Sequence, residues 1–297
     1  MQKTPLIAWI MLVGLAAIWG SSFILIKKGL VVLSAQEVGS LRIVAASLFL
    51  LPFALSRLNR VDRSKFLPLV GAGFLGSLIP AFLFAVAQTR LESAITGVLN
   101  TLVPIFTILI GFVLFGQRQS RMVFLGILIG FIGTAILITA GDGGSFGGIN
   151  AYALLVVLAT LCYASNLNLI KAKLNDLHPL TVTSISLFLV GPIATVYLFG
   201  FTDFVTKLST VEGAGLATFY ICLLGVLGTS IALIIFNRVL QMTDALFASS
   251  VTYIIPIVAV IWGVIDGERI YAIQYLGMLA VGLGVYIANR NREAQKK

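Results

Sequence analysis

Charged residues are scarce in this sequence. They make up 10% of its 297 residues, whereas hydrophobic residues make up 59% and the mean hydropathy is +1.06. Soluble domains carry about 25% charged and about 45–50% apolar residues. A water-soluble fold of this size has too little interior to hide so much apolar surface. The composition therefore excludes a soluble globular protein and indicates a protein whose main solvent is lipid.

Histidine and cysteine are also scarce. The single histidine, His178, excludes a metal site built from several histidines. Cys162 and Cys222 both lie inside apolar runs, and their spacing fits neither a disulfide framework nor a metal site. The net charge of +9 comes from basic residues in short loops rather than along one face, so no nucleic-acid partner is expected. We expect no metal and no cofactor.

Long apolar runs fill the rest of the chain. A helix that spans a bilayer needs about 20 mostly apolar residues. Ten such spans are predicted, at residues 6–26, 36–56, 67–88, 93–115, 121–140, 150–171, 179–201, 214–236, 245–265 and 271–289. The first run is too long for the apolar region of a signal peptide, so it is interpreted as an uncleaved helix. The sequence predicts an all-α membrane protein with ten transmembrane helices.

The loops differ in their content of Lys and Arg. With ten spans, fourteen basic residues lie on the side that holds both termini, and five lie on the other side. Short loops rich in Lys and Arg stay in the cytoplasm. Both termini are therefore predicted to be cytoplasmic.

The two halves of the sequence resemble each other. The stretch 93–111 matches 245–263, with Pro104 opposite Pro256, and the stretch 125–133 matches 276–284. Small residues recur in many membrane bundles, but prolines and glycines paired at matching depths favour a true repeat. Because each half holds an odd number of spans, the second half is predicted to be inverted relative to the first. The predicted units are residues 1–140, a Gly-rich external loop at 141–149, and residues 150–297 with a basic cytoplasmic tail.

An ordered set of motifs resembles a known family. It comprises Trp19-Gly20-Ser21-Ser22-Phe23, Arg42, Ser93-Ala94 with Leu102-Val103-Pro104, the Leu-Gly…Gly pattern of span 121–140, and Gly267-Glu268-Arg269. Over residues 6–289 the chain is similar to the drug/metabolite transporter superfamily, EamA type. The first half departs from the family pattern at Gly116-Gln117, where a Gly-Glu pair is usual. This departure leaves any salt bridge of a glutamate at position 117 in doubt.

The resemblance implies a multi-pass protein of the bacterial inner (plasma) membrane. It also implies export of small metabolites, amino acids or toxic compounds, through a central cavity between the two halves. On this basis we expect a small-molecule substrate and membrane lipid as the partners.

Two mid-span prolines mark candidate binding positions. Proline removes a hydrogen bond to the carbonyl four residues earlier and bends the helix. Pro104 would free the carbonyl of Asn100, and Pro256 would free that of Thr252. Binding of substrate to these groups and a plain helix kink are both open interpretations.

Other candidates are polar and aromatic side chains within the spans. Buried amides in a membrane must face protein or water, which favours a cavity lining for the polar span 150–171. Aromatic residues of the first and third spans could form walls, although core packing is the alternative for each. The predicted substrate cavity comprises Trp19, Ser22, Phe23, Phe84, Asn100, Thr101, Tyr163, Asn166, Thr252 and Tyr253.

Arg42 is the one basic residue that lies inside a predicted span rather than at its first or last residue. It could attract a substrate carboxylate or gate the outer mouth. Alternatively, it could extend outward or pair with Glu37 or Glu92 near the outer surface. All eleven acidic residues lie in loops or at span ends, which argues against a proton relay through a carboxylate at mid-membrane.

These patterns favour a secondary transporter that exports amino acids or related small metabolites by alternating access. A membrane enzyme would need a nucleophile with its base, a carboxylate dyad or metal ligands within the spans, so no catalytic residues are expected. A non-transporting scaffold and a drug or toxic-compound efflux carrier are the alternatives. Glycines such as Gly126, Gly130, Gly277 and Gly284 either let helices approach within the chain or mark the face of a homodimer.

Overall fold

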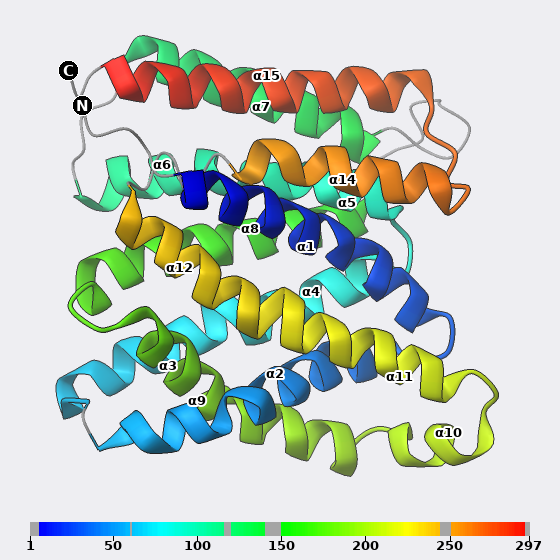
Figure 1. Cartoon of the computed structure of the whole chain (residues 1–297). Helices are drawn as coiled ribbons and strands as arrows, with labels where there is room; N and C mark the ends of the chain where they lie inside the picture. The colour runs from blue at the N-terminus through cyan, green and yellow to red at the C-terminus, as the bar shows by residue number, and fades with distance from the viewer. Residues whose placement is uncertain (1–5, 60, 116–119, 140–149, 244–250, 295–297) are drawn as a thin grey trace.

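The computed structural model describes residues 6–294 apart from 60, 116–119, 140–149 and 244–250. These residues form helices and no strands (Figure 1). The helices are α1 (Leu6–Leu30), α2 (Ala35–Leu58), α3 (Phe66–Gly73), α4 (Ile79–Ala87), α5 (Ser93–Leu99), α6 (Val103–Phe115), α7 (Arg121–Thr139), α8 (Ala151–Leu169), α9 (Pro179–Gly200), α10 (Phe204–Thr210), α11 (Ala214–Leu223), α12 (Ala232–Met242), α14 (Val251–Ile265) and α15 (Ala272–Ala294).

Short irregular turns join several of these helices into longer ones. The turns η1 (Arg63–Lys65) and η3 (Asn100–Leu102) are 3₁₀-helical. The turns η2 (Phe74–Leu78), η4 (Ile170–Leu174) and η5 (Leu224–Ile231) are π-helical. As a result, α3 and α4 form one rod through η2, and α11 and α12 form another through η5.

Eight helical stretches of the described chain are long and apolar enough to cross a membrane. They are Leu6–Leu30, Ala35–Leu58, Arg63–Ala87, Ser93–Val113, Arg121–Thr139, Ala151–Leu174, Pro179–Gly200 and Ala214–Val239. The last two predicted spans correspond to shorter apolar helices, Ile254–Ile265 and Ala272–Ala288. The expected all-helical membrane architecture is confirmed, whereas the count of ten spans stays a prediction. The short helix α10 lies in a segment expected to be a loop.

Local capping explains where some helices begin. At the start of α2 the amide of Glu37 donates to Ser34 Oγ at 3.2 Å, and the amide of Ser34 donates to Glu37 Oε2 at 2.7 Å. This reciprocal pair is a capping box. At the start of α9, Nδ1 of His178 accepts from the amide of Leu180 at 3.2 Å, and Pro179 occupies the first helical position. The single histidine thus caps a helix.

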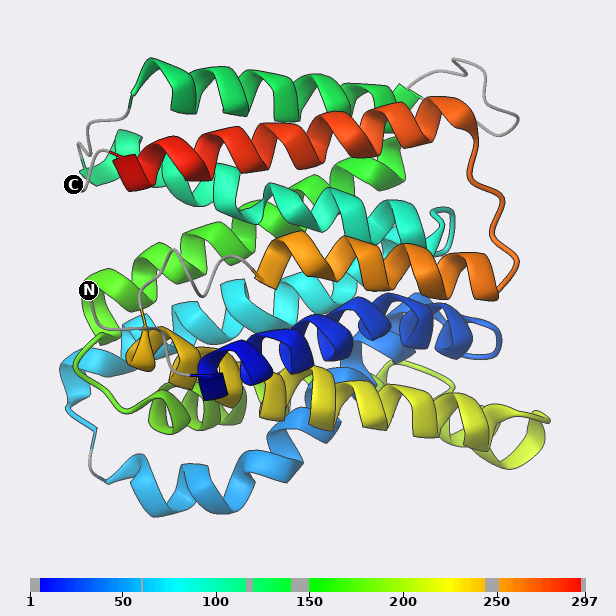
Figure 2. The same cartoon turned by 45° about the horizontal axis from the view of Figure 1, so that its top comes forward.

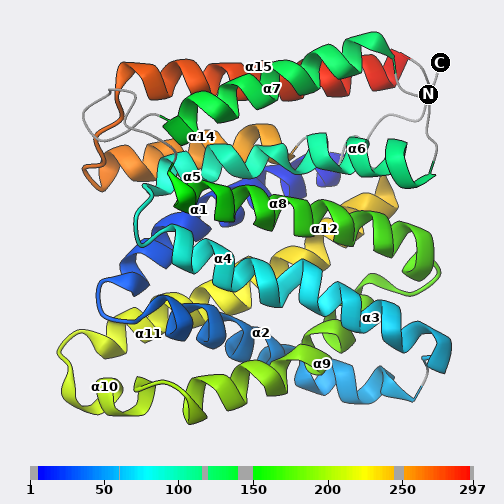
Figure 3. The same ribbon diagram turned by 180° about the vertical axis from the view of Figure 1, so that it is seen from behind.

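The long helices lie side by side and run between two ends of one bundle (Figures 1 and 2). The start of α1 and the end of α15 lie at the same end, and η4 also lies there (Figures 1 and 3). We call this end the Lys171 end, after the first of the two exposed lysines of η4. The opposite end, where α1 finishes, is called the Lys27 end.

Helices α7 and α15 pack against each other along one side of the bundle (Figures 1 and 3). A Cβ atom built on Gly126 would lie 2.5 Å from the amide nitrogen of Ala288 and 2.6 Å from the carbonyl oxygen of Gly284. One built on Gly133 would lie 2.7 Å from the carbonyl oxygen of Gly277. Glycines therefore let these two backbones touch, as small residues do in membrane bundles. Of the two interpretations, close approach within the chain is the one observed for this seam.

Apolar side chains fill the interior and also cover the outside. The largest fully buried side chains include Phe84, Leu12 and Ile43. Large apolar side chains are exposed on the outer helices, for example Val196, which is 62% exposed, and Leu279, which is 63% exposed. Apolar surface on this scale would be unstable in water but is solvated by lipid chains.

Candidate functional site

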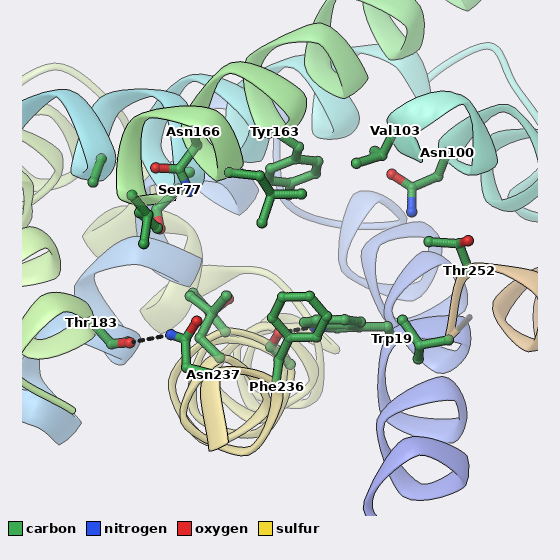
Figure 4. A pocket seen from close by; sticks show the side chains of 18 of the residues that line it. Trp19, Ser77, Asn100, Val103, Tyr163, Asn166, Thr183, Phe236, Asn237 and Thr252 are labelled. Atoms are coloured by element: carbon green, nitrogen blue, oxygen red, sulfur yellow. Dashed lines mark hydrogen bonds between the residues drawn. The ribbon is translucent and has the colours of Figure 1, made fainter. Parts of the chain in front are cut away.

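A cavity of about 550 Å³ lies inside the bundle. Figure 4 shows Asn166, Tyr163 and Asn100 along one wall, and Trp19 and Phe236 on the wall that faces them. Thr252 lies near Asn100 and Trp19. Small-molecule sites are typically concave and of about 300–1,000 Å³, with apolar walls and a few polar groups. The cavity has the size and composition of such a site.

Irregular turns supply part of the lining. Ser77 belongs to η2, Asn100 to η3, Lys171 to η4 and Thr229 to η5, and all four residues line the cavity. π-helical turns are rare and occur often at functional sites, because the wider turn re-aims side chains and leaves backbone groups less tightly bonded. Irregular turns of four spans thus lie beside the hollow.

Most of the residues predicted to form a substrate cavity line this one. They are Trp19, Ser22, Phe23, Phe84, Asn100, Tyr163, Asn166 and Thr252. Pro104 and Arg42 line it as well. The structure therefore brings together residues far apart in the sequence, while their role in binding substrate stays a prediction.

The remaining predicted residues are Thr101 and Tyr253, and Pro256, which was predicted only as a helix kink. Thr101 is buried away from the lining, and its hydroxyl donates to the carbonyl of Val98 at 2.7 Å. Pro256 lies within α14 but does not line the cavity. The side chain of Tyr253 lies outside the described residues. Thr101 points away because its position in the tight turn η3 turns it toward the preceding helical turn.

The expected free carbonyl at Asn100 is a prediction that was wrong. In η3 the amide of Val103 donates to the Asn100 carbonyl, so a 3₁₀ hydrogen bond replaces the one that Pro104 cannot make. The backbone of Asn100 is therefore satisfied. Its side-chain amide, rather than its carbonyl, is the polar group at the cavity.

The aromatic side chains are fixed by contacts with one another and with the backbone. Trp19 Nε1 donates to the carbonyl of Gly228 at 2.9 Å, and its ring centroid lies 5.3 Å from that of Phe236. The ring of Phe84 stacks on that of Tyr163 with centroids 5.9 Å apart. These separations are those of favourable aromatic pairs. The apolar walls are therefore held in place before any ligand enters.

Polar groups of the lining are only partly satisfied. Asn237 Nδ2 donates to Thr183 Oγ1 at 3.3 Å (Figure 4). In contrast, the side-chain oxygens Oδ1 of Asn100 and Asn166 and Oγ of Ser186 are buried without a hydrogen-bond partner among the described residues. A buried polar group left unpaired costs about 1–3 kcal/mol. Such groups mark where a ligand could complete the hydrogen bonding.

Arg42 lies inside the cavity wall rather than at the surface. It is 9% exposed, and its Nε donates to Thr229 Oγ1 at 2.9 Å. The suggested pairing with Glu37 or Glu92 is wrong, because these acids form ion pairs with lysines at 2.8 and 3.2 Å. Within the described part of the chain, Arg42 forms no ion pair.

The cavity opens toward one end of the bundle. Lys171 and Asn175 are the exposed residues of its lining, and both lie at the Lys171 end. On α1 the lining stops at Ile26, which is 1% exposed. The hollow therefore reaches solvent at the Lys171 end and is shut off from the Lys27 end.

Ion pairs tie the elements together at the Lys27 end. Lys27 Nζ lies 3.2 Å from Glu92, 3.0 Å from Asp266 and 2.9 Å from Glu268. Lys28 pairs with Asp266 as well. We call these five residues the Lys27 cluster. It joins the end of α1 to the loop before α5 and to the loop between α14 and α15.

Glu268 does more than pair with a lysine. Its side chain is fully buried and accepts from the amide of Ser93 at 2.9 Å, from the amide of Ala94 at 3.0 Å and from the Ser93 hydroxyl. A carboxylate at the free amides of a helix start is stabilised by those amides and by the helix dipole. Glu268 therefore caps α5 from a distant part of the chain.

The two glutamates of the cluster differ in their pKa. Burial raises the pKa of Glu92, and the neighbouring carboxylate of Glu268 raises it further, against the opposing effect of Lys27. Burial would also raise the pKa of Glu268, but hydrogen bonds from Ser93, Lys27 and the amide of Ala94 outweigh it and hold that pKa below its usual value. Glu268 is thus the firmly ionised partner of the lysine.

The sequence pattern of a transporter family covers almost all of this chain. The EamA-like transporter family matches residues 6–139 and 150–290. The chain belongs to this family. The resemblance drawn from the motifs is confirmed. The cavity and the Lys27 cluster described above therefore belong to a member of this family.

Curated relatives of this EamA-like protein carry transporter names. "Uncharacterized inner membrane transporter YedA" from Escherichia coli strain K12 is 25% identical over 281 residues, which cover 93% of this chain and 88% of the relative. "Uncharacterized transporter" from Archaeoglobus fulgidus is 25% identical over 287 residues, which cover 96% of this chain and 99% of the relative. Together with the family match and the apolar helices, these names confirm the expected multi-pass inner-membrane protein.

A solved structure shares the fold. One crystal structure superposes with a TM-score of 0.66, covering 97% of this chain and 98% of its own chain at 16% sequence identity. At this identity the similarity concerns the fold alone.

Several lining residues of this EamA-like protein were not among the predicted ones. Thr183 and Ser186 on α9, Asn237 on α12 and Thr229 on η5 all line the cavity. The signal was present, because each is a polar residue within an apolar span, as Asn166 is. The same criterion, extended to spans 179–201 and 214–236 and to Asn237 beside the latter, identifies them.

Proposed function

We propose that this chain is a secondary transporter that exports amino acids or related small metabolites across the inner membrane. Its two five-helix halves, residues 1–140 and 150–297, form inverted repeats joined by the external loop 141–149. Substrate binds in the central cavity and is released by alternating access. In this proposal both termini and the Lys171 end face the cytoplasm, and the Lys27 end faces outward.

The observation that carries the proposal is the asymmetry of the cavity. It is open at the Lys171 end, while ion pairs close the Lys27 end. The Lys27 cluster joins residues of the first family-matched segment to residues of the second, so separation of the two segments there would break it. An inward-facing state of a carrier has this arrangement, with a single path to solvent.

Basic residues support the orientation. The exposed Lys171 and Lys173 of η4 lie at the same end as the start of α1 and the end of α15. Lys- and Arg-rich loops stay in the cytoplasm. The proposal needs only a monomer, because the glycine seam of α7 and α15 is used inside the chain.

A drug or toxic-compound efflux carrier of the same family is the second candidate. The aromatic walls built from Trp19, Phe84 and Phe236 favour it to the extent that an apolar cargo would bind there. A membrane enzyme is not proposed. The described lining holds no carboxylate and no cysteine, and its one arginine and one lysine supply neither a nucleophile–base pair nor a carboxylate dyad.

Counterflow in proteoliposomes tests the transport function. Purified protein is reconstituted, liposomes are loaded with one unlabelled amino acid at a time, and uptake of the same radiolabelled amino acid is measured. Saturable uptake is expected for at least one neutral amino acid, and it should be absent from liposomes prepared without the protein. Absence of uptake for the whole panel would overturn the proposal, whereas uptake of lipophilic cations alone would favour the efflux carrier.

Replacement of Asn166 by alanine is expected to weaken binding of substrate. The change removes the side-chain amide whose oxygen has no hydrogen-bond partner among the described residues. One lost hydrogen bond of about 1 kcal/mol corresponds to an increase in KM of about five-fold. Ser165→Ala, one residue earlier on α8 but outside the lining, is the matched control. Equal KM values for both variants in the counterflow assay would exclude Asn166 from the site.

Labelling of single cysteines tests the orientation. In a background in which Cys162 and Cys222 are replaced by serine, Lys171→Cys and Val31→Cys place one thiol at each end of the bundle; Val31 is 77% exposed. A membrane-impermeant maleimide is expected to label position 31 in intact cells and position 171 only in inside-out vesicles. The reverse pattern would place the Lys171 end outside.

A further inference from the structure

Arg42 presents a cationic guanidinium inside the cavity. Its Nε is held by Thr229, which lies in the π-helical turn η5. This bond fixes the guanidinium from one edge, and the group forms no ion pair with a described acid. Two parallel N–H groups of arginine match the two oxygens of a carboxylate.

The charge of Arg42 is not compensated by a described acid. The described ion pairs engage Glu37, Glu92, Asp176, Asp266 and Glu268 with lysines, and none of these acids lines the cavity. A charged side chain within a membrane span is expensive and ordinarily has a partner. Among the described lining residues, Arg42 therefore has no anionic partner.

Neutral acceptors lie beside this cation. The guanidinium of Arg42 is close enough to the phenol of Tyr163 to interact with it electrostatically. Figure 4 shows Asn166 on one side of Tyr163 and Asn100 on the other, and both amides have a buried oxygen without a described partner. Amide oxygens accept hydrogen bonds from an ammonium group without forming an ion pair that would be hard to break.

We propose that Arg42 binds the carboxylate of the transported substrate, while the side-chain oxygens of Asn100 and Asn166 accept from its amino group. This inference rests on the proposed function and assigns its substrate class. The cargo is a solute with one carboxylate, and its best form is a zwitterion with an uncharged side chain. Cations are disfavoured, because they would meet Arg42 with no acid among the described lining residues to offset it. Phosphate esters are expected to bind weakly, because the described lining holds no second buried cation to pair with their second negative charge.

Three probes of one shape separate the chemical groups. Phenylalanine carries both groups, 3-phenylpropionate lacks the amino group, and phenethylamine lacks the carboxylate. All three carry the same phenyl group on a two-carbon chain, so the apolar part that meets the aromatic walls is the same. Binding to detergent-purified protein is measured by the rise in Tm, because a ligand of the folded state stabilises it. Inhibition of radiolabelled amino-acid uptake into proteoliposomes by each of the three compounds gives a second, independent measure of affinity.

For the wild type, phenylalanine and 3-phenylpropionate are expected to bind, with phenylalanine the tighter of the two, and phenethylamine is not. In Arg42→Gln the affinity for both carboxylates is expected to fall by about 30-fold or more, as for a buried charge pair that loses one partner. Lys173→Gln removes the same charge from an exposed residue of η4 that does not line the cavity. That control is expected to leave both affinities within about three-fold of the wild type.

The outcomes distinguish this inference from the proposed function. The role of Arg42 is overturned, while transport stands, by either of two results. One is that Arg42→Gln keeps the wild-type affinities for phenylalanine and 3-phenylpropionate; the other is that the wild type binds phenethylamine as tightly as phenylalanine. No binding and no flux of any amino acid overturns the proposed function itself. Should Arg42→Gln not fold, Arg42→Lys carries the test, since a point charge without the fork is expected to weaken 3-phenylpropionate about ten-fold. Unaltered affinity in that variant would overturn the inference.

Discussion

Replacement of Gly284 by alanine is expected to lower the free energy of unfolding by about 3 kcal/mol. A Cβ atom at this position would lie 2.6 Å from the carbonyl oxygen of Gly126 and 2.6 Å from the Cα of Gly130. These are backbone atoms of α7, which cannot move aside as a flexible side chain can. Helices α7 and α15 must therefore separate along their whole seam. Thermal unfolding in detergent, followed by tryptophan fluorescence, measures the loss.

The same helix offers a matched control. Gly282 lies two residues away on α15, and a Cβ atom there would meet nothing within 4 Å. Gly282→Ala is expected to be neutral or stabilising by up to about 1 kcal/mol, because alanine favours the helix over glycine. Equal Tm values for the two variants would show that the glycine seam does not hold these helices together.

Replacement of Glu268 by alanine is expected to cost about 3–5 kcal/mol, the range found when one partner of a buried ion pair is removed. The change leaves Lys27 without its closest carboxylate and leaves the amides of Ser93 and Ala94 uncapped. Glu268→Gln retains an acceptor for the amides but loses the charge, so its loss should be smaller. Asp176→Asn, which disrupts an exposed pair at the opposite end, should change Tm little.

The pH dependence of stability separates the two glutamates of the Lys27 cluster. The pKa of Glu268 is lowered in the fold, so its stabilising contribution is present above its unfolded pKa and is lost as pH falls through the folded one. The pKa of Glu92 is raised, so ionisation of Glu92 opposes folding and its protonation at lower pH relieves that cost. In a pH series that runs from neutral to well below the usual glutamate pKa of 4.5, Glu268→Gln should flatten the acid loss of Tm, and Glu92→Gln should not. Parallel pH profiles would contradict this assignment.

The sequence predicted the helices well because apolar runs of membrane length leave little choice of conformation. Residues such as Trp19, Asn166 and Arg42 were identified because polar or aromatic groups in an apolar run must face something. The sequence did not predict the partners of these groups. Arg42 meets Thr229, 187 residues away, and Lys27 meets Glu268, 241 residues away. Such pairings depend on how the helices pack, and no local pattern encodes them.

Irregular turns were the other feature that the sequence left undetermined. Pro104 predicted the loss of a helical hydrogen bond to the carbonyl of Asn100. In the structure the 3₁₀ turn η3 supplies a different hydrogen bond to that carbonyl, so it is not free. The π-helical turns η2 and η5 hold no proline themselves, although both contain glycine beside serine or threonine and Pro80 follows η2. These residues permit an irregular turn but do not specify a π-helical one. The width of a helical turn is decided by the neighbours it meets.

The π-helical turns also set the phase of each rod. Successive residues of an α-helix are rotated by about 100°, so the extra residue of a π-turn advances every side chain beyond it by about that angle. Before η2 the rod packs mainly on α9, and after it on α8 and α2; before η5 the second rod packs on α1 and α2, and after it on α1 and α9. Each span therefore contacts partly different neighbours on the two sides of its π-helical turn. A one-residue deletion within η2 or η5 would turn half of the span away from its partners, so the length of these rods is constrained as strictly as their composition.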